Sequence, residues 1–193
     1  MNKDQLRSQF LDRRLSLSKE EVNQQSEIIQ ERLLRSSLWP KSGRVALYSA
    51  VKNEVKTGTL FQAALEQGLH VYFPRVEQGI AYYEVNGPED LQKGSWSVLE
   101  PKMECDSLPE EAQFDLLVCP GIVLSKTGHR IGYGRGFYDR FIENLPETTP
   151  VIALGYDFQV VDEIPNDSWD HSLHGIMTEK NLYQLKEISK KKA

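Results

Sequence analysis

The segment 114–121, with the sequence FDLLVCPG, decides the fold of this chain. Its four consecutive apolar residues, LLVC, show no alternation with polar ones, which is typical of a short strand buried on both faces. Pro120 and Gly121 mark the end of the strand. Strands buried on both faces belong to parallel sheets covered by helices. The segment therefore predicts an α/β protein.

The rest of the chain alternates between helix and strand patterns. Helices are predicted over 2–17, 18–38, 57–67 and 136–144, with Leu6, Phe10, Leu11, Leu15, Val22, Ile28, Ile29, Leu33 and Leu34 facing inward. Strands are predicted over 45–48, 69–73, 114–119, 151–155 and 175–178. A further strand is predicted over 80–85, and the sequence leaves open whether it runs antiparallel to its neighbour. We expect Pro74 to stop its strand and 86–112 to be irregular. A largely parallel sheet with helices on both faces follows, in a single domain over 1–193.

Composition limits the classes of function. The 193 residues carry a net charge of −5, which argues against a dedicated nucleic-acid binder. No apolar run approaches 18 residues, and the charged start does not resemble a signal peptide, so we expect neither a membrane span nor secretion. Two cysteines are too few for a disulfide scaffold. We therefore expect a cytoplasmic protein.

The segment 128–140, GHRIGYGRGFYDR, is the strongest functional signal. Five of the 13 glycines fall between Gly121 and Gly136, beside three arginines. Glycines let backbone N–H groups approach a ligand, and guanidinium groups suit phosphate oxygens. The spacing matches neither the Walker motif nor the dinucleotide fingerprint, and a tight turn is the alternative. Because the segment follows the strand 114–119, we favour a polyphosphate site at the carboxyl edge of the sheet.

Four side chains outside this segment, together with Asp139 within it, are candidates for the same site. Lys3 and Arg7 lie four residues apart on one helix face, either in solvent or across a nucleotide. Glu54 follows a predicted strand, and is either a solvated loop residue or an acceptor for a heterocyclic amine–amide edge. Asp139 and Asp170 are candidate Mg²⁺ ligands, or else cap and turn residues.

Other reactive side chains give weaker evidence of a functional site. The pair His171 and His174 has no third ligand nearby, so we do not predict a zinc site. Cys119 is expected in the core rather than as a nucleophile. No Ser–His–Asp arrangement can be derived from the sequence.

The ordered motifs resemble the 5-formyltetrahydrofolate cyclo-ligases over nearly the whole chain. The residues that carry the resemblance are Lys3, Leu6, Arg7, Arg14, Glu54-Val55, Thr57, Phe73–Val76, Glu100-Pro101, Asp115–Gly121, Gly128, Arg130–Arg140, Gln159, Pro165, Asp170 and Met177–Glu179. The resemblance implies a three-layer α/β/α sandwich of the NagB/RpiA/CoA-transferase-like type. It also implies ATP- and Mg²⁺-dependent conversion of 5-formyltetrahydrofolate to 5,10-methenyltetrahydrofolate, through a phosphorylated formyl group, with release of ADP and phosphate.

The same resemblance assigns roles by position. Residues expected to bind ATP are Lys3, Arg7, Arg130, Gly132, Gly134, Arg135, Gly136 and Tyr138, of which Arg135 and Tyr138 are also the expected catalytic residues. The folate is assigned to Glu54, Tyr133 and Phe137, and Mg²⁺ to Asp139 and Asp170. The substrate is a small molecule, and we expect a monomer without nucleic-acid or membrane partners.

Three positions depart from the family pattern. Lys56 and His174 stand where an acidic residue is common, and Ser125 replaces a common aspartate. Because of these departures, the sequence does not fix whether the protein turns over its substrate. One alternative is therefore a nucleotide- or folate-binding protein that does not turn over, and another, by fold analogy, is a sugar-phosphate isomerase or acyl-CoA transferase.

Overall fold

The computed structural model describes residues 1–94, 98–165 and 172–186. Its main sheet has seven strands in the order β12-β11-β9-β6-β1-β2-β3. Their bounds are β1 Arg44–Ala46, β2 His70–Val76, β3 Ile80–Glu84, β6 Leu116–Pro120, β9 Val151–Leu154, β11 Gly175–Met177 and β12 Leu182–Gln184. The central strands pair in parallel, and only the edge strands β3 and β12 are antiparallel. The predicted α/β class with a largely parallel sheet is confirmed.

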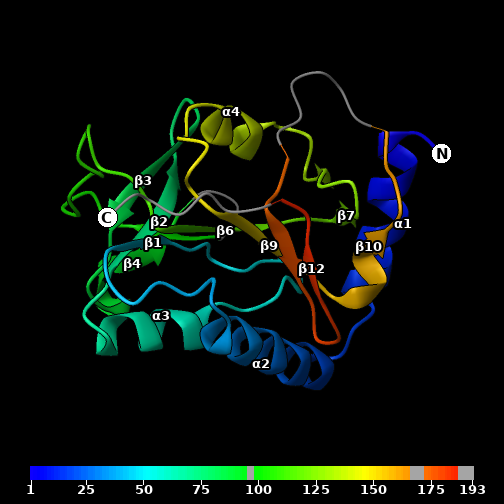
Figure 1. Ribbon diagram of the computed structural model, residues 1–193, viewed down its shortest axis with the longest axis horizontal. Helices are drawn as coiled ribbons and strands as arrows, with labels where there is room; N and C mark the ends of the chain where they lie inside the picture. The colour runs from blue at the N-terminus through cyan, green and yellow to red at the C-terminus, as the bar shows by residue number, and fades with distance from the viewer. Residues whose placement is uncertain (95–97, 166–171, 187–193) are drawn as a thin grey trace.

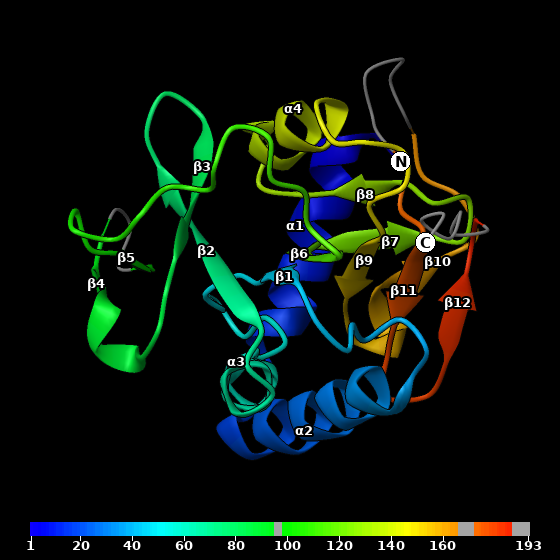
Figure 2. The ribbon, with the colours of Figure 1, turned by 60° about the vertical axis from the view of Figure 1, so that its left-hand side comes forward.

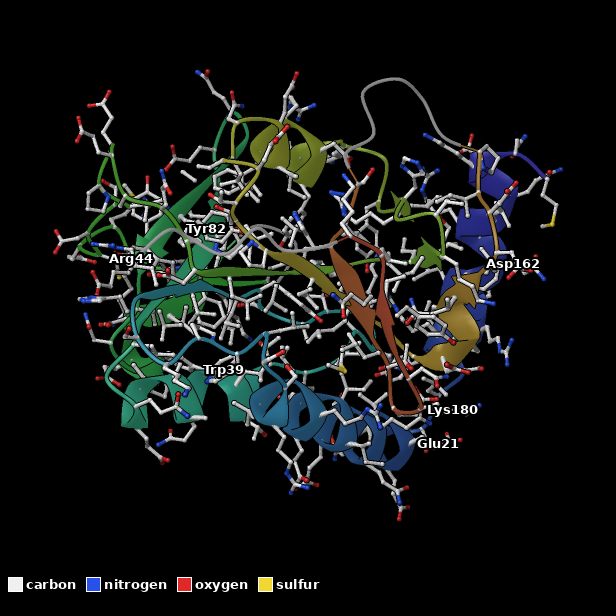
Figure 3. The ribbon with its side chains drawn as sticks, in the orientation of Figure 1. Glu21, Trp39, Arg44, Tyr82, Asp162 and Lys180 are labelled. Carbon is white, nitrogen blue, oxygen red and sulfur yellow. The ribbon has the colours of Figure 1, made fainter. Side chains whose placement is uncertain are left out.

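Helices cover both faces of the main sheet, as Figure 1 shows. The helices α2 (Lys19–Arg35) and α3 (Gly58–Glu66) lie along one face, and α4 (Phe137–Glu143) lies on the other. Alternate residues of β6 serve the two layers: Leu116 and Val118 pack toward α2 and α3, whereas Leu117 and Cys119 pack toward α4. Figure 3 shows Trp39 and Tyr82 in these two layers. The uninterrupted apolar run in the sequence reflects burial on both sides.

A smaller sheet holds the first helix in place. It has the order β10-β7-β8, with β7 Val123–Ser125, β8 Arg130–Ile131 and β10 Val160–Val161. The helix α1 (Lys3–Leu15) packs Leu6, Phe10 and Leu11 against apolar residues of this region. Figure 2 shows α1 behind β7 and β8, beside the end of the main sheet. The N-terminal helix is thereby positioned next to the Gly-rich segment.

Four expectations from the sequence are wrong in detail. Strand β2 continues through Pro74, because beyond Tyr72 it pairs with β3 alone and needs no second ladder. The segment 86–112 is not wholly irregular, since it holds η1 (Pro88–Asp90), β4 (Leu91–Lys93) and β5 (Leu99–Pro101). Leu15 and Ile28 are expected to face inward, but both side chains are exposed.

Among the described residues, no helix has the length and apolar character needed to cross a bilayer.

The order of the strands places a crevice between β1 and β6. From β1 the chain passes through α3 to β2 on one side, whereas β6 leads to β9 on the other. In open α/β sheets such a reversal leaves a ligand crevice outside the carboxyl ends of the strands. Glu54 follows β1, and the Gly-rich segment follows β6, so both reach this edge.

Candidate functional site

A cavity of about 820 Å³ occupies this carboxyl edge. Five parts of the fold line it: α1, the loop after β1, the turn after β6, the segment from β8 into α4, and the strands β2, β3 and β5. Its lining includes the cations Lys3, Arg7, Lys52, Arg130, Arg135 and Arg140 and the carboxylates Glu54, Glu100, Asp139 and Glu143. A volume of this size accommodates drug-sized organic ligands.

The Gly-rich loop is joined to α1 on one side of the cavity. The Arg7 Nε donates to the carbonyl oxygen of Gly132 at 2.8 Å, and its guanidinium also pairs with Asp4. Gly134 has a φ of +89°, and a Cβ there would lie 3.4 Å from a guanidinium nitrogen of Arg7. Only glycine adopts this backbone readily, so the sequence allows the loop to approach the helix. The first helix and the loop therefore form one cationic wall.

Arg130 fixes the other end of the loop. Its side chain is almost fully buried, and its Nη1 donates to Oδ1 of Asp139 at 2.8 Å. The guanidinium also lies 5.5 Å from the ring centroid of Tyr138. Since Asp139 and Tyr138 belong to the first turn of α4, these contacts tie β8 to that helix. The ion pair engages one of the two carboxylate oxygens of Asp139.

Two buried charged residues, Arg14 and Glu54, form a network beside the cavity. Glu54 is 4% exposed and Arg14 is 1% exposed. The Arg14 guanidinium donates to the carbonyls of Lys52 and Gly121, each at 3.0 Å, and to the Tyr133 hydroxyl at 2.5 Å. It also pairs with Oε1 of Glu54 at 3.8 Å, while Oε2 of Glu54 accepts the backbone N–H of Val51 at 3.0 Å. Arg14 thus joins the loop after β1, the turn after β6 and the Gly-rich loop.

Burial sets the protonation behaviour of this network. It raises the pKa of Glu54, and the opposing charge of Arg14 only partly offsets the rise. Burial, together with the neighbouring Glu54 carboxylate, raises the pKa of Tyr133 to about 12. The phenol therefore keeps its proton at neutral pH, and its oxygen accepts the hydrogen bond from Arg14.

The loop that carries Glu54 has an unusual backbone. Lys52 and Asn53 have φ values of 48° and 58°, in a region that side-chain-bearing residues seldom adopt. The Asn53 side chain donates to carbonyls at and just after the end of α1, among them that of Leu17 at 2.9 Å. The Tyr156 hydroxyl donates to the carbonyl of Asn53 at 3.0 Å. These contacts hold the strained loop in one conformation, as is common at binding sites.

The cavity brings together all the candidate residues within the described chain. These are Lys3, Arg7, Glu54, Arg130, Gly132, Tyr133, Gly134, Arg135, Gly136, Phe137, Tyr138 and Asp139. Their individual ligand roles stay predictions. Asp170 and His171 lie outside the described residues. The described part of the chain holds no cluster of three or more side chains suited to a metal.

The sequence assigns no ligand role to Arg14, Lys52, Glu100, Arg140 or Glu143, of which all but Arg14 line the cavity. Arg14 is the hub of the buried network, and its place in the family resemblance was the only signal for it. Glu100 lines the cavity from β5. By contrast, Lys56, Ser125 and His174 do not line the cavity, so the departures from the family pattern leave its walls intact.

Cations gathered at the carboxyl edge of an open α/β sheet are the arrangement expected of an enzyme that acts on small anionic ligands. Residues 1–179 match the 5-formyltetrahydrofolate cyclo-ligase family. A probable 5-formyltetrahydrofolate cyclo-ligase of Caenorhabditis elegans is 32% identical, covering 84% of this chain and 85% of that protein. The protein described here belongs to the 5-formyltetrahydrofolate cyclo-ligase family, whose members are ligases of folate one-carbon metabolism.

Solved structures agree with this assignment. The 5,10-methenyltetrahydrofolate synthetase of Aquifex aeolicus superposes with a TM-score of 0.84 at 32% identity, over 100% of this chain and 97% of that chain. The synthetase of Mycoplasma pneumoniae gives a TM-score of 0.74 at 26% identity, over 93% of this chain and 99% of that chain. The predicted family is therefore confirmed by both sequence and fold, whereas the NagB/RpiA-like label stays a prediction.

Proposed function

We propose that the protein uses ATP and Mg²⁺ to convert 5-formyltetrahydrofolate to 5,10-methenyltetrahydrofolate, with release of ADP and phosphate. The observation that carries the proposal is one cavity that unites a cationic Gly-rich wall with a buried carboxylate. A triphosphate needs the first, and a heterocycle with N–H donors needs the second. Family membership supplies the folate reaction to which these two ligands belong.

The cationic wall suits the triphosphate. Lys3, Arg7, Arg130 and Arg135 come from two distant parts of the chain and line the same cavity. The approach of Gly134 to Arg7 keeps the loop close to the helix. We assign the nucleotide phosphates to this wall, with Arg135 and Tyr138 nearest the transferring group.

The buried carboxylate suits the folate. Glu54 accepts hydrogen bonds, and a pterin presents adjacent N–H donors on its amine–amide edge. Arg14 and Tyr133 hold Glu54 in place, so little ordering is left to occur on binding. We assign the pterin to Glu54, Tyr133 and Phe137.

The described part of the site offers the Asp139 carboxylate to a Mg²⁺ ion. Magnesium ions in nucleotide sites take one or two protein carboxylates, and phosphate oxygens and waters complete the shell. Asp139 lines the cavity beside the cationic loop and is one such ligand. Asp170, the second ligand in this proposal, lies outside the described residues. When bound, the ion neutralises charge on the phosphates.

The reaction needs positioning more than a protein nucleophile. The formyl oxygen attacks the terminal phosphorus of ATP, the bond to ADP breaks, and an iminium phosphate results whose carbon stays bonded to N5. N10 of the folate then attacks the formyl carbon, loses its proton, and phosphate leaves as the ring closes. The protein orients the two ligands and places guanidinium charge at the transferring group.

The cysteines play no part in this chemistry. Cys119 lies in the core, and burial raises the pKa of its thiol to about 11, so it is protonated and inert at neutral pH. Neither Cys105 nor Cys119 forms a disulfide. Unpaired cysteines fit a reducing compartment, and we propose that the protein acts in the cytoplasm as a monomer.

The test is a spectroscopic assay with a binding measurement beside it. Purified protein is mixed with 5-formyltetrahydrofolate, ATP and Mg²⁺, and absorbance of the methenyl product is followed. Product that requires both ATP and the divalent ion supports the proposal. Tight binding of both ligands without product would instead identify a folate- or nucleotide-binding protein without turnover. Product formed without ATP would contradict the phosphorylated intermediate.

A further inference from the structure

A second carboxylate in the cavity has no part in the network described above. Glu100 lies on β5, is 6% exposed and lines the cavity. Its Oε1 is buried and accepts no hydrogen bond. Within residues 1–94, 98–165 and 172–186, no cation pairs with this side chain. Glu54, by contrast, pairs with Arg14 and accepts a backbone N–H.

A carboxylate in this position is unfavourable for the ligand-free protein. Removing an ionised group from water costs free energy, which hydrogen bonds and counter-charges normally offset. Buried polar groups without partners are rare in folded proteins. Such a group at the wall of a ligand cavity is explained if the bound ligand supplies the missing donor.

The surroundings of Glu100 define which ligand this is. Pro74, Val76, Ile80 and Val98 line the cavity from the same group of strands, β2 and β3 and the approach to β5. Among the described lining residues of these strands only Glu100 is charged, and the cations lie on α1, on the loop after β1 and on the segment from β8 into α4. A phosphate or a carboxylate would be repelled there, whereas a planar heterocycle with an N–H group would be held.

The local backbone leaves room for this carboxylate. A Cβ on Gly94 would lie 2.1 Å from Oε2 of Glu100 and 2.4 Å from its carboxyl carbon. The Gly94 N–H donates to the carbonyl of Val98 at 2.8 Å, which closes the turn between β4 and β5. This pair of strands forms a separate two-stranded sheet at the side of the main one (Figure 2). Glycine at position 94 thus allows Glu100 to occupy its site.

We propose that Glu100 is a second carboxylate anchor for the folate, accepting a hydrogen bond from an N–H group other than those of the amine–amide edge assigned to Glu54. The inference rests on the proposed function, because the folate is the ligand placed there. Reduced pterins carry such N–H groups on more than one edge, so two carboxylates can hold one ring system from two sides. The nucleotide base also carries N–H donors, and the experiment separates the two ligands.

The experiment compares Glu100→Gln with the wild-type protein in the absorbance assay. Glutamine keeps the shape and removes the charge. We expect the KM for 5-formyltetrahydrofolate to rise about tenfold or more, while the KM for ATP is unchanged. The melting temperature of the ligand-free variant should be equal or higher, because an unpaired buried charge is lost. The increase in melting temperature on adding the folate should become smaller. A purely structural role for Glu100 predicts the reverse, with a less stable variant and an unchanged folate KM.

Two further variants sharpen the result. Gly94→Ala keeps the carboxylate but displaces it, so the folate KM should rise here also. Glu104→Gln removes a charge from an exposed residue nearby that does not line the cavity, and the folate KM should not change. A rise in the ATP KM alone, or equal folate KM values for Glu100→Gln and Glu104→Gln, overturns the inference. Because wild-type turnover is measured in parallel, absence of product from the wild type would refute the proposed function instead.

Discussion

Replacing Arg14 with leucine should destabilise the protein through the charge that it leaves behind. Arg14 is 1% exposed and is the counter-charge of Glu54, which is itself 4% exposed. Removing one member of a buried ion pair typically costs about 3–5 kcal/mol, since the other charge stays buried without compensation. The carbonyls of Lys52 and Gly121 lose their guanidinium donors as well. Against a total stability of about 5–15 kcal/mol, this is a large fraction.

Urea unfolding measures the effect. With a denaturant slope of about 2 kcal/mol per molar urea, the midpoint of Arg14→Leu should fall by about 2 M. The matched control is Arg13→Leu, one residue earlier on the same helix. Arg13 is exposed, and its main described contact is with the ring of Phe158, 4.4 Å away. Loss of that contact should cost about 1 kcal/mol or less.

A double variant identifies the cause. In Arg14→Leu with Glu54→Gln, the uncompensated charge is gone, so the double variant should be more stable than Arg14→Leu alone. If the double variant is no more stable, the loss comes from packing or from the carbonyls and not from the carboxylate. A midpoint for Arg14→Leu within about 0.3 M of that for Arg13→Leu would refute the electrostatic reasoning altogether.

Three further predictions concern the loop, the metal and pH. Arg135→Ala should leave the free energy of unfolding within about 0.5 kcal/mol of wild type, as is usual for surface changes, and lower activity with ATP strongly. Unchanged kcat and KM for ATP would remove Arg135 from the site. Asp139→Asn should lower activity and be partly restored by higher Mg²⁺, and wild-type Mg²⁺ dependence would exclude Asp139 from the metal shell. Burial lowers the pKa of His174, whose Nδ1 accepts the N–H of Val151 at 3.2 Å. The unfolded chain therefore binds the proton first as pH falls below about 6.5, and stability should fall toward pH 5. In His174→Gln this loss should be smaller, and equal pH profiles of the urea midpoint would contradict the assignment.

The main sheet could be predicted because its signal is local. The runs 45–48, 114–119 and 151–155 are largely apolar, and β1, β6 and β9 overlap them to within a residue or two at each end. Shorter strands such as β7 and β8 could not be predicted, since β8 has two residues inside a Gly-rich loop. Their pairing depends on contacts with each other and with β10, which no local pattern encodes.

The sequence predicts which residues belong to the site, but not the contacts between them. The Gly-rich loop and Glu54 could be found from residue type and from their positions after strands. What makes them a site is contact between segments far apart in sequence: Arg7 meets Gly132 across 125 positions, and Arg14 meets Tyr133 across 119. In the sequence, Arg13 and Arg14 are equivalent charges near the end of one helix, yet one lies in solvent and the other is almost fully buried.

The difference between the two arginines follows from the helix rotation fixed by Leu6, Phe10 and Leu11. Successive residues of a helix point about 100° apart, so packing one stripe determines which of two neighbours faces the sheet. With that stripe seated on the small sheet, Arg14 is directed at Gly121 and Glu54, and Arg13 at Phe158. A change that rotated α1 by one residue, so that Leu15 took the place of Arg14, would turn Arg14 to the exposed position that Arg13 now has. The buried carboxylate of Glu54 would then lose its partner, although no residue of the cavity had been replaced.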